Sequence, residues 1–227
     1  MKARKKAKFK KRYWLLAGLV IVILIPVLSL YRPARYNPSE LAPAGGKPGQ
    51  VSPYLTHQFL PQLYNGAQRG EPFDLVAIQK GINEIIAWSE WPKEFDGIRF
   101  LAPVVLFVPD SIILMGAVNI KGVEFVVTIV AEAGVDEQGL LNLRVAKVKV
   151  GAVNITFLAK VMARTMYQKQ LAAIPLNRQD LRAQIAASIL NDEPFEPVFE
   201  VEDKKVRVEK ITIEQEKLTI RLTPASD

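Results

Sequence analysis

One apolar run near the N-terminus constrains this chain more than any other feature. Residues 14–30 carry no charge, and they follow a segment, 1–12, that contains eight Lys or Arg and no Asp or Glu. With Tyr13 and Tyr31 the run reaches 19 residues, near the lower limit for a helix that crosses a bilayer. A basic flank stays on the cytoplasmic side. We therefore expect a cytoplasmic tail over 1–12, a single transmembrane helix over 13–31 in the inner (cytoplasmic) membrane, and an extracytoplasmic remainder.

A cleaved signal peptide is the alternative interpretation of this segment. Such peptides have an apolar region of about 7–15 residues with a small-x-small cleavage site close behind it. Here the run is longer, and the residues that follow it are Tyr31, Arg32 and Pro33. The nearest small-x-small pattern, at 42–44, lies further downstream and contains a proline. These features favour a retained anchor over a cleaved peptide.

The net positive charge of the chain comes from its N-terminal tail. The formal net charge is +7, with 30 Lys or Arg and 23 Asp or Glu, but from Tyr13 onward only 22 basic residues (30 − 8) remain against the 23 acidic ones. A nucleic-acid-binding surface on the folded part therefore has no support. The chain has no cysteine, which excludes disulfides and thiolate metal ligands and favours a bacterial source for an exported domain.

Residues 32–72 are assigned to a linker. The stretch from Pro33 to Pro53 is rich in Pro, Gly and Ala, which is typical of an extended tether rather than of a packed core. The apolar residues available to dock this segment onto the folded part are Tyr54, Leu55, Phe59, Leu60 and Leu63.

Hydrophobic periodicity predicts an α+β domain over 73–227. The expected elements, in order, are a helix over 74–88, strands over 104–108, 111–120, 123–133 and 141–150, helices over 155–171 and from a cap at Asn177, and strands over 195–201, 206–213 and 218–222. Short turns such as Lys121-Gly122 join the strands, which indicates antiparallel pairing. The apolar parity changes between Val145 and Val148, which predicts a bulge or a twist. The whole pattern predicts a transmembrane helix followed by a curved antiparallel sheet packed with helices.

These strand and glycine patterns resemble a known family. The segments that carry the resemblance are VPDSIILMGAVNIKG (108–122), FVVTIV (125–130), GLLNLRVAKVKVG (139–151), KKVRVEKITIE (204–214) and LTIRL (218–222). They are similar to the YpmS-like family of uncharacterised bacterial single-pass membrane proteins over roughly residues 73 to 223. The resemblance implies a short cytoplasmic tail and an extracytoplasmic α+β domain. The basic tail, the long linker and the segment 191–199 depart from the family pattern.

Two further implications follow from the resemblance. The family has no established catalytic residues to transfer to this chain. More loosely, the pattern is similar to tubular lipid-binding folds, in which a helix lies against a curled sheet and encloses an apolar groove. That likeness implies a fold and not an activity.

The sequence contains no recognisable catalytic, metal-binding or nucleotide-binding motif. His57 is the only histidine and lies in the expected linker, so a histidine metal site or a Ser-His-Asp triad has no basis. No nucleophile elbow, phosphate loop or dinucleotide fingerprint is present. We therefore expect no catalytic residue, no metal and no cofactor, and a non-enzymatic domain.

Consecutive apolar residues in the expected strands suggest a binding function. Helices on both faces of the sheet would explain them, and so would an apolar groove that holds an acyl chain. The residues expected to line such a groove are Trp88, Trp91, Phe100, Phe125, Val127, Phe157, Met162 and Met166. The first hypothesis is a membrane-tethered domain that binds a lipid or another apolar ligand in the cell envelope. The alternatives are a structural or scaffolding subunit that binds an envelope protein partner and, with least support, an envelope enzyme.

Overall fold

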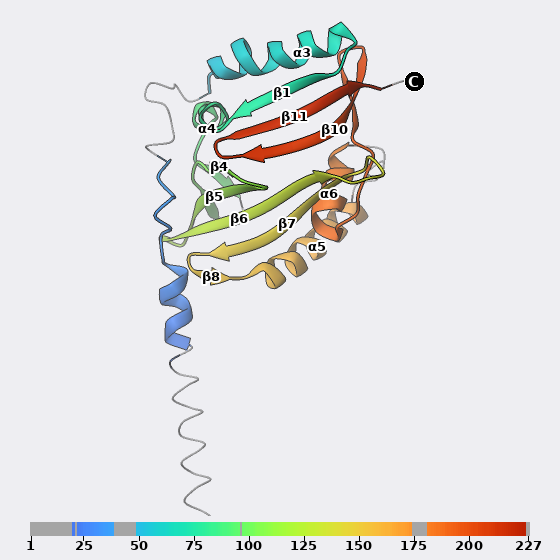
Figure 1. The fold of residues 1–227 in the computed structure, drawn as a ribbon. Helices are drawn as coiled ribbons and strands as arrows, with labels where there is room; N and C mark the ends of the chain where they lie inside the picture. Colours follow the sequence, from blue (N-terminus) through green and yellow to red (C-terminus); the bar gives the residue numbers. More distant parts are fainter. Residues whose placement is uncertain (1–19, 21, 39–48, 96, 174–180, 226–227) are drawn as a thin grey trace, which may run out of the picture.

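The structure is a computed structural model that describes residues 20, 22–38, 49–95, 97–173 and 181–225, without the side chains of 95, 166, 168–173 and 182. Every strand pairing within this part is antiparallel, and helices pack around the strands (Figure 1). The expected α+β class is therefore confirmed.

The strands form two sheets. The smaller sheet has the order β1 (Phe73–Ile78), β11 (Lys217–Pro224), β10 (Lys204–Glu214) and β9 (Val198–Val201). The larger sheet has the order β2 (Lys93–Phe95), β3 (Ile98–Phe100), β5 (Ser111–Ile120), β6 (Val123–Val135), β7 (Leu141–Val150) and β8 (Val153–Asn154), and β4 (Val104–Val108) also pairs with β5.

Local sequence signals set the register of the larger sheet. Lys121 and Gly122 join β5 to β6 with φ of 51° and 87°, as a two-residue type I′ turn requires. Between β6 and β7 the register shifts from Val130↔Lys147 to Ala131↔Val145, so Ala146 is an extra residue. The bulge expected between Val145 and Val148 is therefore confirmed.

Helices cover the smaller sheet near its first strand. These are η1 (Leu55–Phe59), a π-helical turn, α3 (Leu60–Arg69) and α4 (Gln79–Trp88). Leu63 and Ala67 of α3 pack with Val201 and Val206. The absence of a side chain at Gly66 lets α3 approach β1, because a Cβ there would lie 2.3 Å from the ring of Phe73.

The folded part begins before residue 73, where the expected linker was to end. Residues 55–69 are helical, Tyr54 is 5% exposed, and Phe59 and Leu63 pack against the core of the smaller sheet. The apolar residues of this stretch therefore join the domain, as docking residues, despite the surrounding prolines and glycines.

The helix predicted over 74–88 is wrong for its first residues. Residues 73–78 form β1, which pairs with β11 from Phe73↔Leu222 to Ile78↔Lys217. The alternation of buried Leu75 and Ala77 with more exposed neighbours fits a strand as well as a helix over so short a span. The pairing with β11, which is distant in the sequence, decides in favour of a strand.

A shared core joins the two sheets. Phe107 of β4, Ala77 of β1 and Ile213 of β10 form one buried cluster. Two backbone hydrogen bonds reinforce the junction, from Asp110 N to Ile213 O at 3.1 Å and from Glu216 N to Phe107 O at 3.1 Å.

Two further helices, α5 (Thr156–Ala173) and α6 (Leu181–Asn191), lie beside β7. Ser188 of α6 is fully buried, and its Oγ accepts a hydrogen bond of 2.8 Å from Leu143 N. Phe195 exchanges backbone hydrogen bonds with Leu141, and Thr156 Oγ1 accepts one of 2.9 Å from Val148 N. The free edge of β7 is therefore covered. The expected helix cap at Asn177 lies outside the described residues.

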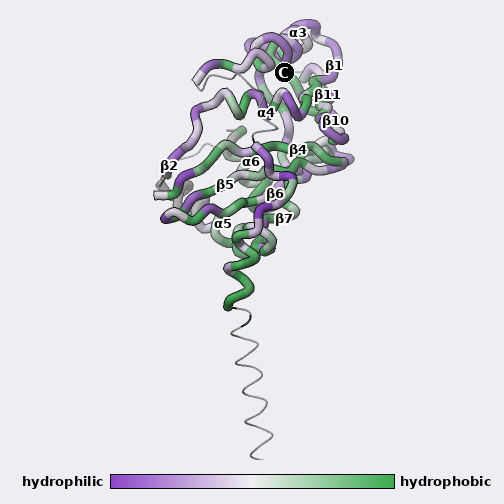
Figure 2. The backbone as a smooth tube through the Cα atoms, turned by 90° about the vertical axis from the view of Figure 1, so that its left-hand side faces the viewer, coloured by the Kyte–Doolittle hydropathy of each residue, from purple (hydrophilic) through white to green (hydrophobic). Residues whose placement is uncertain are grey.

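The N-terminal segment docks on the folded part. Residues 22–29 are helical and largely hydrophobic (Figure 2). Their apolar side chains are exposed, and Leu28 O accepts a hydrogen bond of 2.8 Å from Ala152 N. The phenol oxygen of Tyr36, which is 4% exposed, accepts one of 3.1 Å from Ala117 N. Beyond the undescribed 39–48, Gly49 N donates to Trp88 O at 2.9 Å. Within the expected tether, 33–38 and 49–53 are attached to the domain by the buried side chains of Tyr36 and Ser52 and by hydrogen bonds.

Most of the expected transmembrane helix, 13–31, lies outside the described residues. Among the residues that the structure describes, no helix has both the length and the apolar character to cross a membrane.

Candidate functional site

The candidate site lies at a break in the strand ladder of the larger sheet. One edge of β5 pairs with β6, and the other pairs first with β4, up to Val104↔Met115, and then with β3, from Phe100↔Val118. Residues 101–103 separate β4 from β3. Leu101 N still donates to Ala117 O at 2.9 Å, but Pro103 has no N–H to continue the ladder.

A glycine opens the sheet surface at this break. Alternate residues of a strand share a face, so Leu114, Gly116 and Val118 of β5 lie on the same side. Val127 of β6 pairs with Gly116. A Cβ at Gly116 would make only ordinary contact, 3.6 Å from Pro103 Cβ, so the missing side chain leaves free space above β5.

The result is a partly open pocket of about 220 Å³. Its lining residues are Trp91, Phe100, Leu101, Pro103, Leu114, Gly116, Ala117, Val118, Val127 and Ile129. None of them is ionisable. The pocket therefore offers an apolar environment to a ligand and no acid, base or nucleophile.

Trp91 lines the pocket with an indole ring whose N–H already has a hydrogen-bond acceptor. Its indole Nε1 donates a hydrogen bond of 2.9 Å to Ile86 O, at the end of α4. Lys93 Nζ lies 5.0 Å from the ring centroid, within cation–π range. Both contacts restrain the indole, and the burial of its polar N–H leaves apolar ring surface for a ligand.

The size of the pocket limits its occupant. Sites for drug-sized ligands have volumes of about 300–1,000 Å³, and this pocket, at about 220 Å³, is smaller. It suits the end of an acyl chain or one large apolar side chain, and not a whole phospholipid.

The structure brings three of the expected lining residues together. Val127, Trp91 and Phe100 all line the pocket. Phe125 lies on the same face of β6 as Val127, but it pairs with Val118 one step further along and does not line the pocket. Trp88, the last residue of α4, is half-buried and also lies outside the lining.

The expected lining residues of α5 lie elsewhere. Phe157 is 84% exposed and Met162 is 56% exposed, so neither encloses a groove. The side chain of Met166 lies outside the described residues. The exposed apolar side chains of α5 therefore face away from the sheet.

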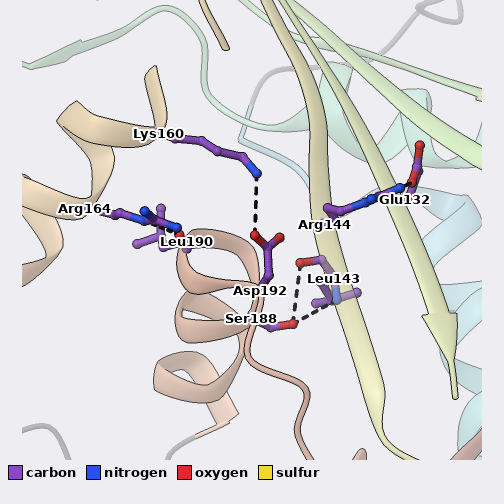
Figure 3. A network of polar contacts seen from close by, with 8 residues as sticks. All are labelled: Glu132, Leu143, Arg144, Lys160, Arg164, Ser188, Leu190 and Asp192. Atoms are coloured by element: carbon purple, nitrogen blue, oxygen red, sulfur yellow. Dashed lines mark hydrogen bonds and ion pairs between the residues drawn. The ribbon is translucent and has the colours of Figure 1, made fainter. Parts of the chain in front are cut away.

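The half-buried side of α5 carries Ala159, Lys160, Ala163 and Tyr167, and Lys160 and Arg164 reach toward the end of α6 (Figure 3). Lys160 Nζ lies 3.8 Å from a carboxylate oxygen of Asp192, and Arg164 Nε donates a hydrogen bond of 2.7 Å to Leu190 O. Nearby, an ion pair between Arg144 and Glu132 joins β7 to β6. These polar contacts orient α5 with its apolar stripe outward.

The sequence reasoning missed Pro103 and Gly116 as parts of a site. A glycine inside a strand signals a close backbone approach or a gap, and a proline between two strand-like runs signals a break in the ladder. Read together, the two residues point to the pocket.

A second, larger hollow is more polar. Its volume is about 530 Å³, and its lining residues are Ala34, Arg35, Asn37, Gln79, Leu106, Val108, Pro109, Gln215 and Glu216. The side chain of Gln79 is engaged, because its Oε1 accepts a hydrogen bond of 2.8 Å from Phe107 N. Arg35 and Glu216 are the ionisable residues of this lining, which brings no catalytic set together.

Among the residues that the structure describes, no group of three His, Asp or Glu side chains is placed to hold a metal ion. His57 is exposed in η1, and its Nδ1 lies 3.1 Å from Pro53 O and 3.1 Å from Thr56 Oγ1. Its contacts are those of a local turn.

Comparison with known proteins finds no family model, no curated protein and no solved structure that matches this chain.

Proposed function

We propose that this protein is a single-pass membrane protein whose extracytoplasmic domain binds an apolar group, such as the end of an acyl chain, in the pocket at the strand break. The observation that carries the proposal is the pocket itself: ten lining residues, all uncharged, around a partly open space of about 220 Å³. Burial of an apolar group there contributes about 25 cal/mol per Å² of surface removed from water. A non-enzymatic role and a relationship to the YpmS-like family belong to the same proposal.

The N-terminal sequence supports the membrane part of the proposal. Eight cations precede an uncharged run of 17 residues, 14–30. In the described part of this run the side chains point outward, with Val22 68% exposed, Ile23 58% and Val27 60%. A helix that is apolar on every exposed side needs an apolar surrounding, and a bilayer supplies one.

A pocket-filling substitution tests the ligand proposal. The full chain is purified in a mild detergent and titrated with a fluorescent fatty acid, and co-purified lipid is measured by native mass spectrometry. Val127→Trp fills the pocket and should abolish saturable uptake. Ile120→Trp is the matched control, because Ile120 lies in β5 at a position 40% exposed and outside the lining.

Uptake by the wild type and by Ile120→Trp, with loss in Val127→Trp, is the expected result. Equal uptake by all three would place the fatty acid elsewhere. A wild type that is folded, by circular dichroism, but takes up no fatty acid would remove the proposed ligand class.

A structural subunit of an envelope complex is the second candidate function. The exposed apolar side chains of α5 favour it, because exposed apolar patches mark interaction surfaces. Crosslinking in membranes from a photoreactive residue at Phe157 would test it. A single crosslinked protein of defined mass would support this function, and crosslinks to lipid alone would count against it.

A further inference from the structure

The exposed side of α5 forms one continuous apolar stripe. Phe157 is 84% exposed, Leu158 55%, Val161 45% and Met162 56%. The pairs 157–161 and 158–162 are spaced four residues apart, so these side chains are neighbours on one side of the helix. Lys160 contacts Asp192, just after α6, and Arg164, beside the stripe, donates to Leu190 O at the end of α6. An exposed apolar stripe of this size requires a covering medium.

The stripe lies beside the end of the N-terminal helix. Ala152 N donates to Leu28 O at 2.8 Å, and a Cβ at Gly151 would lie 2.4 Å from the carbonyl oxygens of Leu28 and Ser29. The helix α5 begins only four residues after Ala152, at Thr156. Both views show α5 at the end of the molecule from which the helical segment 22–29 emerges (Figures 1 and 2).

The start of α5 is fixed rather than loosely attached. Thr156 N donates a hydrogen bond of 3.0 Å to Asn154 Oδ1, and Thr156 Oγ1 accepts one of 2.9 Å from Val148 N. The exposed Phe157 therefore follows directly on a residue held against β7. Its position relative to the end of segment 22–29 is set by the β7–β8 turn.

The charge near the stripe is mainly positive. Residues 138–173 contain six Lys or Arg and no Asp or Glu, although Lys160 is paired with Asp192 and Arg144 with Glu132. Lys147 and Lys149 lie in β7 just before the turn that contacts Leu28, and neither has an ion-pair partner among the described residues. Apolar side chains flanked by cations are the pattern of a helix that binds an anionic lipid surface.

We propose that α5 is a membrane-surface helix: its stripe of Phe157, Leu158, Val161 and Met162 inserts into the outer leaflet of the bilayer, with Lys147 and Lys149 at the level of anionic headgroups. The inference rests on the proposed membrane anchorage. A bilayer is the occupant favoured over a protein, because the stripe lies near the exposed apolar segment 22–29 and the nearby cations Lys147 and Lys149 have no ion-pair partner among the described residues. The domain therefore has two membrane contacts, the anchor and α5.

Site-directed spin labelling tests this position in the full chain. The protein has no cysteine, so one introduced cysteine is the only attachment site for a nitroxide. The labelled positions are Phe157 and Met162 on α5, Leu24 in the expected anchor, and Tyr64 on α3, which lies at the opposite end of the molecule (Figure 1) and is 38% exposed. Each variant is placed in vesicles of phosphatidylcholine mixed with phosphatidylglycerol. Collisions with oxygen, which concentrates in lipid, and with a water-soluble nickel chelate are then measured.

The expected result is that labels at Phe157, Met162 and Leu24 favour oxygen and that the label at Tyr64 favours the nickel chelate. If Leu24 favours oxygen while Phe157 and Met162 behave like Tyr64, the α5 proposal fails and the anchorage stands. If Leu24 also favours the nickel chelate, the anchorage fails and the α5 proposal fails with it. Labels at Phe157 and Met162 that are shielded from both reagents would show a protein cover instead, and this result too would overturn the proposal.

A charge substitution provides an independent measurement. Phe157 and Met162 are more than half exposed, so Phe157→Glu combined with Met162→Glu should leave the fold intact. A nitroxide at Val161 should then lose its preference for oxygen. The matched variant Tyr64→Glu should leave it unchanged. A Val161 label that keeps its oxygen preference in the double variant would contradict a lipid contact made by the stripe.

Discussion

Tyr36 shows how one side chain joins the N-terminal segment to the sheet. Its phenol oxygen accepts a hydrogen bond from Ala117 N, and its ring belongs to the core cluster around Val104 and Met115. Tyr36→Phe leaves the Ala117 N–H buried without an acceptor, which should lower the free energy of unfolding by about 1–3 kcal/mol. Urea unfolding of both proteins measures the difference. Tyr64→Phe, at an exposed position, should be neutral.

Tyr36 also gives stability a pH dependence. Burial raises the pKa of Tyr36 above its usual value of 10.0; the hydrogen bond from Ala117 N opposes this rise, the charge of Glu124 adds to it, and Arg32 opposes it least. The phenol therefore ionises first in the unfolded chain, so stability is lost as the pH rises above 10 toward the folded pKa. The stability difference between wild type and Tyr36→Phe should narrow in this range. A difference that stays constant up to the folded pKa would contradict this linkage.

Gly66 is required by a close approach between α3 and β1. A Cβ would lie between 2.3 and 2.6 Å from three ring carbons of Phe73. Gly66→Ala should force the ring aside and lower stability by about 1–3 kcal/mol, and adding Phe73→Leu should restore part of it. Thermal unfolding of the single and double variants measures the coupling. Gly134→Ala, where a Cβ meets nothing within 4 Å, is the control.

At the level of elements, the edge of β7 depends on a side chain that is distant in sequence. Ser188→Ala removes the acceptor of Leu143 N and should cost about 1–3 kcal/mol, with faster amide hydrogen exchange at Leu143. Ser89→Ala is the control, because Ser89 Oγ bonds only to Ile85 O of its own helix. Unchanged exchange at Leu143 in Ser188→Ala would show that water or a shifted α6 replaces the hydroxyl.

The elements also show what sequence patterns can predict. The turn at Lys121-Gly122 and the bulge at Ala146 follow from residues within a few positions of each other, and both were predicted. The strand β1 was not predicted, because its pairing with β11 joins Phe73 to Leu222. The alternation of apolar residues within the six positions of β1 gives no information about a partner strand so distant in the sequence.

The candidate site was predictable only in part, for a similar reason. Aromatic and β-branched residues identified Trp91, Phe100 and Val127 as apolar surface, but the pocket exists because β3 and β4 share one edge of β5. The orientation of α5 was not predictable either. The spacing of apolar residues places them on one stripe, but the contacts of Lys160 with Asp192 and of Arg164 with Leu190 O are needed to fix how the helix is turned.

At the scale of the whole molecule, Gly151 sets the position of segment 22–29 on the domain. Its φ is +56°, and a Cβ would lie 2.4 Å from Leu28 O. Gly151→Ala should therefore separate the segment from the β7–β8 turn, at a cost of about 1–3 kcal/mol for the strained backbone. Distances between nitroxides at Leu24 and Val153, measured by pulsed electron resonance, should become longer and broader. A distribution identical to that of the wild type would show that the turn accommodates the methyl group.

The docking of Leu28 and Tyr36 changes where this domain can act. A free linker over 33–53 would have an end-to-end distance of roughly 25 Å, from about 5–6 Å times the square root of its number of residues. The domain could then move over a similar distance. Attachment at both flanks of 39–48 removes that freedom. On the proposed anchorage, the pocket stays at one height above the lipid and meets only molecules that diffuse past it in the plane of the bilayer. Encounters then follow two-dimensional diffusion, and ligand supply depends on the crowding of the membrane rather than on concentration in the surrounding fluid.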